Sequence, residues 1–377
     1  MSRTVGLYIH IPFCQSKCGY CDFYSLPIQE EAVWDAYLKA LTKHLRETAG
    51  PLSQHSVDSV YFGGGTPSLL GAKRLRSLVD VVGKYFQLAQ NAEITLEGNP
   101  DSLDEKDLKK IRRSGFNRLS IGAQSFDDNM LRLLGRAHNA AQITEAISAA
   151  RAAGFYDLSV DLLFGLPGQT LEHWAETLRA GLALEPEHIS CYSLSLEKNT
   201  PLYESTYTFP DDDVQADMFL CAADMLYAAG YHHYEISNYC RPGYECRHNL
   251  KYWTLQPYIG LGPGAHSDFG GRRWSYPREL DLYIAGINAG DALTSHLEDI
   301  PLMERAGEYL MLRLRTARGV SGNEYARTFR VSFEAVERRL EEQRMRGLAL
   351  REGDHWRLTE QGFLLSNRVI GEVLEVM

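Results

Sequence analysis

The first half of the chain alternates short apolar runs with longer amphipathic stretches. Apolar runs of strand length cover the ranges 5–13, 59–65, 93–97, 118–124, 158–164 and 188–194. Between them, apolar residues recur at helical spacing over 31–46, 73–86, 104–113, 142–153 and 171–184. Short strands that alternate with amphipathic helices are typical of parallel sheets with right-handed crossovers. Six such units favour a partial or complete α/β barrel over an open sheet.

The pattern changes after the sixth unit. A helix is predicted over 211–230, where an acidic run at its start suits the positive end of the helix macrodipole. The range 231–298 is rich in Tyr, His, Gly and Pro and predicts irregular backbone. Beyond it, two helical patterns and a hairpin signal around Gly353 indicate a small domain. We therefore divide the chain into a barrel core (1–230), an irregular segment (231–298) and a winged-helix-like α+β domain (299–377).

Composition narrows the function classes. The 377 residues are 44% hydrophobic and 23% charged, as in globular proteins. A net charge of −10 argues against nucleic-acid binding, so we expect the C-terminal domain to pack or dock rather than bind DNA. The start of the chain does not resemble a secretory signal, and no apolar run reaches membrane-spanning length. Seven cysteines, three of them in one loop, fit a reducing compartment, so we expect a cytoplasmic protein.

Cys14, Cys18 and Cys21 follow the first predicted strand in the spacing C-x3-C-x2-C. Iron–sulfur clusters are usually held by four Cys thiolates, so three would leave one iron of a [4Fe–4S] cube open to a substrate or cosubstrate. Zinc is the alternative, but it usually takes four ligands in pairs such as C-x2-C. A chance grouping of three buried cysteines is the remaining explanation.

Unusual polar residues lie in or at the ends of later predicted strands. Gly63-Gly64-Gly65-Thr66-Pro67 follows the second strand, and glycines let a backbone approach a ligand closely. Glu97, Gln124 and Asp161 lie in the third, fourth and fifth strands, where side chains facing a barrel mouth suit an amine, a ribose or an arginine. Arg136 could hold a carboxylate with two bonds. Taken singly, the glycine run is also explained as a tight turn, the three strand residues as satisfied structural polar groups, and Arg136 as a surface arginine.

Taken together, these motifs resemble the radical SAM superfamily, and its coproporphyrinogen III oxidase-like branch in particular. The matching pieces are YIHIPFC, the cysteine loop, GGGTPS, EGNP, RLSIGAQSF, LGRAHN, DLLFGLPGQT and IGLGPGAHS. The resemblance implies a partial (β/α)6 barrel with a [4Fe–4S] cluster on Cys14, Cys18 and Cys21, whose open iron binds S-adenosylmethionine. It also implies that S-adenosylmethionine contacts Tyr8, Tyr20, Gly64, Gly65, Thr66, Glu97, Gln124, Arg136 and Asp161.

Two departures select within this branch. Oxygen-independent coproporphyrinogen III dehydrogenases have CxxxCxxCxC after an N-terminal extension. Here Phe23 occupies the position of the last cysteine in that motif, and the first strand begins near Met1. The run from His248 to Trp253 matches HNxxYW, which resembles the HemW family of haem chaperones. His248 is thus a haem-ligand candidate, with Cys246 and His266 as weaker ones; the alternative is that His248 only pins its loop.

The resemblance predicts a haem chaperone rather than a coproporphyrinogen III dehydrogenase. It would bind haem, the cluster and S-adenosylmethionine, and would deliver haem to haem-requiring proteins such as respiratory enzymes. We also expect a reductant protein such as flavodoxin or ferredoxin, and a homodimer. We expect no nucleic-acid partner. The alternatives are a coproporphyrinogen III dehydrogenase that cleaves S-adenosylmethionine and a haem-remodelling methyltransferase.

Overall fold

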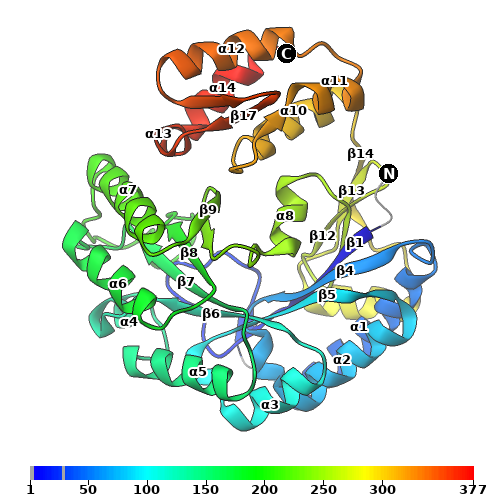
Figure 1. The fold of residues 1–377 in the computed structure, drawn as a ribbon. Coiled ribbons are helices and arrows are strands. Elements are labelled where there is room, and N and C mark those ends of the chain that lie inside the picture. The colour runs from blue at the N-terminus through cyan, green and yellow to red at the C-terminus, as the bar shows by residue number, and fades with distance from the viewer. Residues whose placement is uncertain (1–3, 28–29) are drawn as a thin grey trace.

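A curved sheet of 12 strands forms the body of the molecule (Figure 1). The computed structural model describes residues 4–27 and 30–377. Within them, the strands follow the order β14-β13-β12-β11-β1-β4-β5-β6-β7-β8-β10-β9. The two terminal strands of this order do not pair with each other, so the barrel is partial rather than closed.

The predicted strand–helix units make up the central part of this sheet. Their strands are β1 (Thr4–Ile11), β4 (Ser56–Gly64), β5 (Gln87–Gly98), β6 (Arg118–Gln124), β7 (Leu158–Phe164) and β8 (His188–Ser193). Neighbours in this series pair in parallel. The connecting helices are α1 (Glu31–Ala49), α2 (Gly71–Tyr85), α3 (Glu105–Arg113), α4 (Asp128–Leu133), α5 (Ala140–Ala152) and α6 (Leu171–Ala183), and they line the outside of the sheet in Figure 1. The α/β class and the partial (β/α)6 barrel are therefore confirmed.

Strand β1, which lies within the sheet between β11 and β4, shows why the sheet forms an apolar core. Its side chains Val5, Leu7, Ile9 and Ile11 are all fully buried. Central strands of parallel sheets read as near-continuous apolar runs because they are covered on both faces.

None of the helices that the structure describes combines the length and apolar character needed to cross a membrane.

The expectation of irregular backbone over 231–298 is wrong. This stretch forms β9 (His232–Glu235), β10 (Asn238–Cys240), α8 (Arg247–Trp253), β11 (Tyr258–Leu261), β12 (His266–Phe269), β13 (Arg272–Ser275), α9 (Leu280–Ala289) and β14 (Ser295–Asp299). It follows α7 (Asp212–Ala228), whose N-cap Asp211 accepts a bond from the Val214 amide. Strand β11 pairs in parallel with β1, and the others extend both edges of the sheet. These strands are too short to show a periodicity, and pairing with an existing sheet stabilises them.

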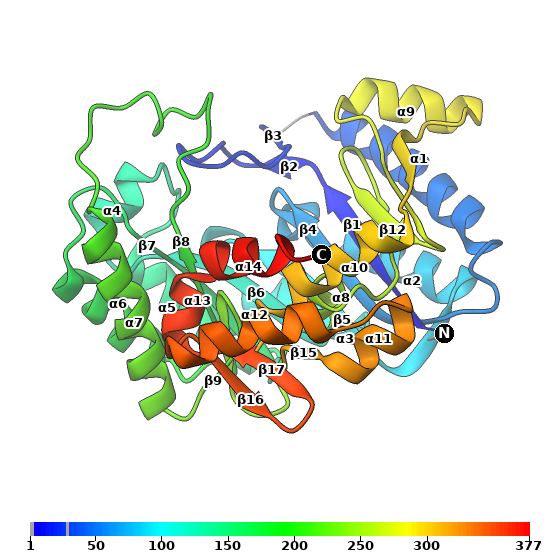
Figure 2. The same cartoon turned by 90° about the horizontal axis from the view of Figure 1, so that it is seen from above.

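The C-terminal region has an apolar core of its own, which includes Leu310, Tyr325, Leu340 and Trp356. Its elements are α10 (Leu302–Arg313), β15 (Val320–Ser321), α11 (Gly322–Phe329), α12 (Glu334–Met345), β16 (Ala349–Glu352), β17 (His355–Leu358), α13 (Glu360–Leu364) and α14 (Ser366–Leu374). The predicted hairpin is β16–β17, and β15 completes a three-stranded sheet. Figures 1 and 2 show this module beside the barrel, next to α7 and α8.

Candidate functional site

The strand ends of the barrel surround a cavity of about 890 Å³. Its lining contains every residue expected to bind the cluster or S-adenosylmethionine, namely Tyr8, Cys14, Cys18, Tyr20, Cys21, Gly64, Gly65, Thr66, Glu97, Gln124, Arg136 and Asp161. They meet because parallel strands present their carboxyl ends at the same edge of the sheet. His248 is not part of this lining.

The cysteine loop begins at Cys14, the last residue of β2 (Phe13–Cys14), which pairs with β3 (Leu26–Pro27). Between these strands the loop is tied down at Gly19, whose amide donates to the Leu134 carbonyl at 3.0 Å and whose carbonyl accepts from the Leu202 amide at 2.8 Å. All three cysteines are partly buried and free of disulfides. Burial raises the pKa of the Cys21 thiol, and the nearby Cys18 and Cys14 add to this shift.

Two polar side chains approach the sulfur atoms. The Thr66 hydroxyl donates to Sγ of Cys14 at 3.6 Å, and Nη1 of Arg136 donates to Sγ of Cys18 at 3.4 Å. Hydrogen bonds and a nearby cation can stabilise the negative charge of thiolates that bind metal. In residues 4–27 and 30–377, no His, Cys, Asp and Glu side chains converge as a single metal ion would require. A four-iron cube does not require this convergence, because each cysteine binds a different iron. The donor set therefore fits such a cluster.

The glycine turn after β4 packs against the chain's own backbone. A Cβ atom on Gly65 would lie 2.5 Å from the carbonyl oxygen of Phe13, so only glycine fits there. Gly64 has a φ of +112°, and a Cβ atom on it would collide with the His10 ring at 2.4 Å. Both glycines also face the cavity, so a ligand contact and a packing requirement coincide here.

Glu97 contributes a carboxyl group to this wall. Its carboxylate accepts from the Tyr61 hydroxyl at 2.7 Å and from the Gly64 amide at 3.1 Å. Burial raises the pKa of Glu97 to about 7, and the charge of Asp161 adds to the shift, whereas the two hydrogen bonds oppose it. A buried carboxyl that titrates near neutrality gains most from a cationic ligand.

Asp161 is held by three hydroxyl groups, one from its own strand β7 and one from each neighbouring strand, β6 and β8. The hydroxyls of Ser190 and Ser159 donate to Oδ1 at 2.7 and 3.1 Å, and that of Ser120 donates to Oδ2 at 2.8 Å. Burial raises the pKa of Asp161, and these bonds counteract the rise. This group of three serines could not be recognised in the sequence, because single serines in strands are common.

Gln124 and Arg136 complete the wall in different ways. Gln124 ends β6 with a φ of +66°, in the left-handed region that side chains rarely adopt, and such strain often accompanies a functional position. Nη2 of Arg136 donates to Oδ1 of Asn99 at 2.6 Å and to the carbonyl oxygen of Gly122 at 2.7 Å. Arg136 is thus fixed within the wall rather than lying on the surface.

His248 lies on α8, behind the cavity. It is fully buried, with Nδ1 bonded to the Ser59 hydroxyl at 2.9 Å and Nε2 bonded to the Tyr252 hydroxyl at 2.9 Å. Burial lowers the pKa of its imidazole to about 3, so the ring is neutral. Tyr252 reaches the cavity lining, whereas His248 packs against Tyr61 with ring centroids 5.2 Å apart. These contacts agree with the alternative in which the histidine pins its segment.

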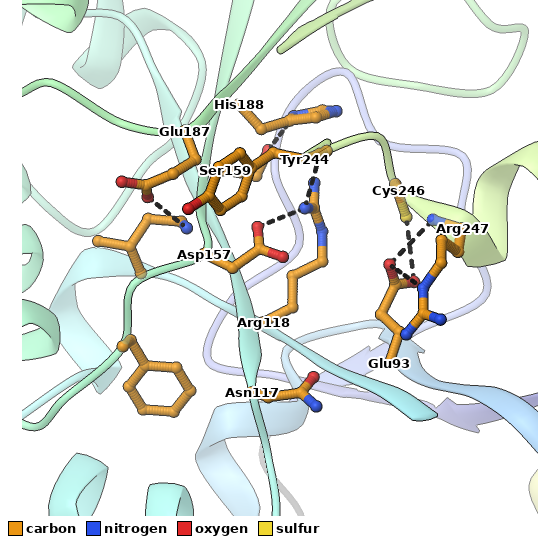
Figure 3. A network of polar contacts seen from close by, with 12 residues as sticks. Glu93, Asn117, Arg118, Asp157, Ser159, Glu187, His188, Tyr244, Cys246 and Arg247 are labelled. Atoms are coloured by element: carbon orange, nitrogen blue, oxygen red, sulfur yellow. Dashed lines mark hydrogen bonds and ion pairs between the residues drawn. The ribbon is translucent and has the colours of Figure 1, made fainter. Parts of the chain in front are cut away.

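Glu93 joins this helix to the floor of the barrel (Figure 3). Its carboxylate accepts from the backbone amides of Arg247 and His248, each at 2.9 Å, and from Sγ of Cys246 at 3.7 Å. Nearby, buried Arg118 forms an ion pair with Asp157 and donates to the Tyr244 carbonyl at 3.2 Å (Figure 3). Cys246 is therefore buried in a polar network and absent from the cavity lining.

A second group of lining residues escaped the sequence analysis, and two of them belong to the stretch expected to be irregular. It consists of His10, Tyr24, Tyr61, Tyr258 and Arg278. His10 is engaged through Nδ1 with the Tyr8 hydroxyl at 3.1 Å and through Nε2 with the Tyr24 carbonyl at 2.9 Å. His266 also lines the cavity, and its ring has no hydrogen bond to any residue that the structure describes. One flank of the cavity is thus aromatic and basic.

Comparisons with known proteins agree with this arrangement. Residues 8–181 match the model of the radical SAM superfamily, and residues 300–365 match that of the HemN C-terminal domain. The chain is 36% identical to the heme chaperone HemW of Bacillus subtilis, with 97% of this chain and 98% of that protein covered. It is 35% identical to the heme chaperone HemW of Escherichia coli, with 97% of each covered.

Among solved structures, the fold is similar to that of coproporphyrinogen III oxidase (HemN) from Escherichia coli. The TM-score is 0.88 over 100% of this chain and 91% of that one, at 22% sequence identity. At this identity the similarity establishes the fold alone.

Proposed function

The chain belongs to the HemW family of haem chaperones, and we propose that it binds haem in the cavity at the strand ends and passes it to haem-requiring proteins. The resemblance drawn from the sequence motifs is confirmed by relatives that match nearly the whole chain. Acceptor proteins such as respiratory enzymes, a flavodoxin or ferredoxin as reductant, a homodimer and a cytoplasmic location belong to the same proposal.

The observation that carries this proposal is the shared cavity. At about 890 Å³ it lies near the upper end of the range of about 300–1,000 Å³ for small-molecule sites. One wall holds the three cysteines with Glu97 and Asp161, and the other flank is aromatic. Space and chemistry therefore support a cluster with S-adenosylmethionine on one side and an apolar macrocycle on the other.

In this proposal, Cys14, Cys18 and Cys21 hold the [4Fe–4S] cluster, and the radical SAM match supports that role. The cluster would supply a structural or redox gate on haem transfer, with S-adenosylmethionine on its open iron. The methionyl and ribosyl groups would meet the wall that includes Glu97 and Asp161, where the charge of the buried carboxylates suits a cationic ligand.

The residue that we assign as ligand of the haem iron differs from His248, the main candidate from the sequence. Both ring nitrogens of His248 are engaged and its side chain is fully buried, so ligation would require it to leave two partners. His266 lines the cavity without a hydrogen bond on its ring, in the part of the chain that the structure describes. We therefore assign the axial position to His266 and a positioning role to His248.

The two enzymatic alternatives receive less support. A coproporphyrinogen III dehydrogenase motif would have a cysteine at position 23, whereas the side chain present is Phe23, which is 68% exposed and lines the cavity. No observed contact specifically favours a haem-remodelling methyltransferase.

The test uses the full chain, purified and reconstituted without oxygen. We expect about four irons per chain, a Soret band on haem addition, and transfer of that haem to an apo-haemoprotein. Haem products should be unaltered, and coproporphyrinogen III should remain unconverted with S-adenosylmethionine and a reductant present. Anaerobic formation of protoporphyrinogen IX would favour the dehydrogenase, and a methylated haem product would favour the methyltransferase. Absence of haem binding would refute the chaperone.

A further inference from the structure

Arg278 is held at the edge of the cavity between two backbone anchors. On one side, the Gly264 amide donates to the Pro277 carbonyl at 3.0 Å. On the other side, the Leu280 amide donates to the hydroxyl of Tyr24 at 3.0 Å. Gly264 packs beside this side chain, because a Cβ atom there would lie in van der Waals contact with Cγ of Arg278, at 3.4 Å. The backbone around Arg278 is therefore anchored by the turn of the GPGAHS motif and by the end of the cysteine loop, while its side chain is exposed at the cavity edge.

The charge of this arginine is not neutralised by the protein. Within residues 4–27 and 30–377, no carboxylate forms an ion pair with Arg278. Other arginines near this edge are paired: Arg273 and Arg305 both contact Asp268, at 3.3 Å in the first case. The neighbours of Arg278 in the cavity are the imidazoles of His10 and His266, and its charge helps burial to lower the pKa of both. An unpaired guanidinium beside neutral rings attracts an anion.

We propose that Arg278 forms a carboxylate-binding subsite that recognises a propionate group of haem. The inference rests on the proposed binding of haem in this cavity. A guanidinium can hold a carboxylate with two parallel hydrogen bonds, which fixes orientation as well as charge. Haem offers such carboxylates at one edge of an apolar plane. Tyr24 and Tyr258, which share the lining with Arg278, offer aromatic surface to that plane.

The methionyl carboxylate of S-adenosylmethionine is the other source of the same chemistry. The order of the sheet argues against it. Glu97, Gln124 and Asp161 lie on β5, β6 and β7, whereas Arg278 follows β13, which lies beyond β1 on the opposite side of the sheet. Arg278 thus belongs to the flank formed by β11 and β12, away from the wall assigned to S-adenosylmethionine.

The experiment compares haem with haem dimethyl ester, in which both carboxylates are masked. Soret titrations are made on reconstituted wild type, Arg278→Gln and Arg278→Lys. Arg272→Gln is the matched control, because Arg272 is exposed on the neighbouring β13 and pairs with exposed Asp299. Iron content, thermal melting and S-adenosylmethionine affinity are measured on each variant.

We expect Arg278→Gln to weaken haem binding about tenfold or more, with Arg278→Lys intermediate, as for loss of a charged hydrogen bond. Binding of the dimethyl ester should be unchanged by either substitution, and Arg272→Gln should behave as wild type. The S-adenosylmethionine affinity and the iron content of every variant should equal those of wild type.

Four outcomes would overturn the proposal. Equal weakening of haem and ester by Arg278→Gln would indicate a packing role, and unchanged haem affinity would remove the subsite. Weaker S-adenosylmethionine binding with unchanged haem binding would assign the arginine to the other carboxylate. If wild type binds neither haem nor its ester, the chaperone proposal itself fails and the subsite with it.

Discussion

The hydroxyl group of Tyr252 bonds to Nε2 of His248 at 2.9 Å, and only the tyrosine of this pair reaches the cavity. Ser59 on β4 holds the opposite ring nitrogen at 2.9 Å, so the histidine bridges a barrel strand and a cavity residue. The HNxxYW motif thus forms a helix whose histidine lies behind the surface that its tyrosine presents.

Replacing His248 by Ala should therefore reduce stability more than it changes haem ligation. Loss of two hydrogen bonds and of a buried ring should cost about 2–4 kcal/mol of unfolding free energy. The Soret maximum of bound haem should remain that of wild type, whereas His266→Ala should shift it. Absorbance titration and chemical denaturation of both variants measure the two effects. A shifted Soret band in His248→Ala alone would restore His248 as the axial ligand.

The pKa of Glu97 predicts how S-adenosylmethionine binding depends on pH. Because burial raises this pKa to about 7, the carboxyl is largely protonated at pH 6 and ionised at pH 8. Only the ionised form attracts a cation, so affinity should rise with pH below about 7, by up to about tenfold per unit, and then level off. Equilibrium dialysis of the reconstituted protein measures this profile.

Replacing Glu97 by Gln should flatten the profile and weaken binding about tenfold to a hundredfold. Glu172→Gln is the control, since Glu172 lies on the surface of α6 in an exposed pair with Arg179. An unchanged pH profile in Glu97→Gln would show that another group governs the dependence.

The sequence was sufficient for the parallel part of the fold because its signals are local. Strands such as β1 are buried on both faces and appear as unbroken apolar runs, and each is followed by a helix of clear periodicity. The cavity wall was also predictable, since Glu97, Gln124 and Asp161 lie in strands whose ends must meet. Motif resemblance supplied the ligand roles, which remain predictions.

The rest of the site depends on contacts between distant segments. Ser59 and His248 are 189 residues apart and meet only when α8 packs on β1 and β4, where Gly6 leaves space for the His248 ring. Short strands β11 and β12 gave no periodicity, so Tyr258 and Arg278 in the cavity flank were missed, and His266 was named only as a weaker candidate for a haem ligand. The strain at Gln124 is likewise a backbone property that residue types do not reveal.

The cysteines provide a direct test of the cluster. Changing Cys14, Cys18 or Cys21 to Ala should abolish the absorbance of the cluster and reduce bound iron to background, because each is expected to bind a different iron. Cys191→Ala is the control, since Cys191 is buried in β8 with 4% of its surface exposed. Iron analysis and circular dichroism would separate cluster loss from unfolding. Retention of about four irons in Cys18→Ala would refute the assignment.

Glu93 should be the residue on which the position of α8 depends most strongly. It is 4% exposed, and its carboxylate satisfies the amides of Arg247 and His248 at the start of this helix. Replacing Glu93 by Ala leaves buried amides without acceptors, which should cost about 2–4 kcal/mol of unfolding free energy. Glu172→Ala, which breaks an exposed pair, should cost about 1 kcal/mol or less.

A purely global loss of stability would not show that Glu93 positions α8, so the decisive measurement is local. Hydrogen exchange under native conditions should accelerate in residues 247–253 of Glu93→Ala, whereas exchange in β6 and β7 should follow the control. Because Tyr252 reaches the cavity from this helix, haem binding should weaken in parallel. Glu93→Gln retains one acceptor oxygen, so its hydrogen-exchange rates in residues 247–253 should lie between those of wild type and Glu93→Ala. Uniform acceleration across the barrel would instead make Glu93 a general core residue with no specific link to the haem site.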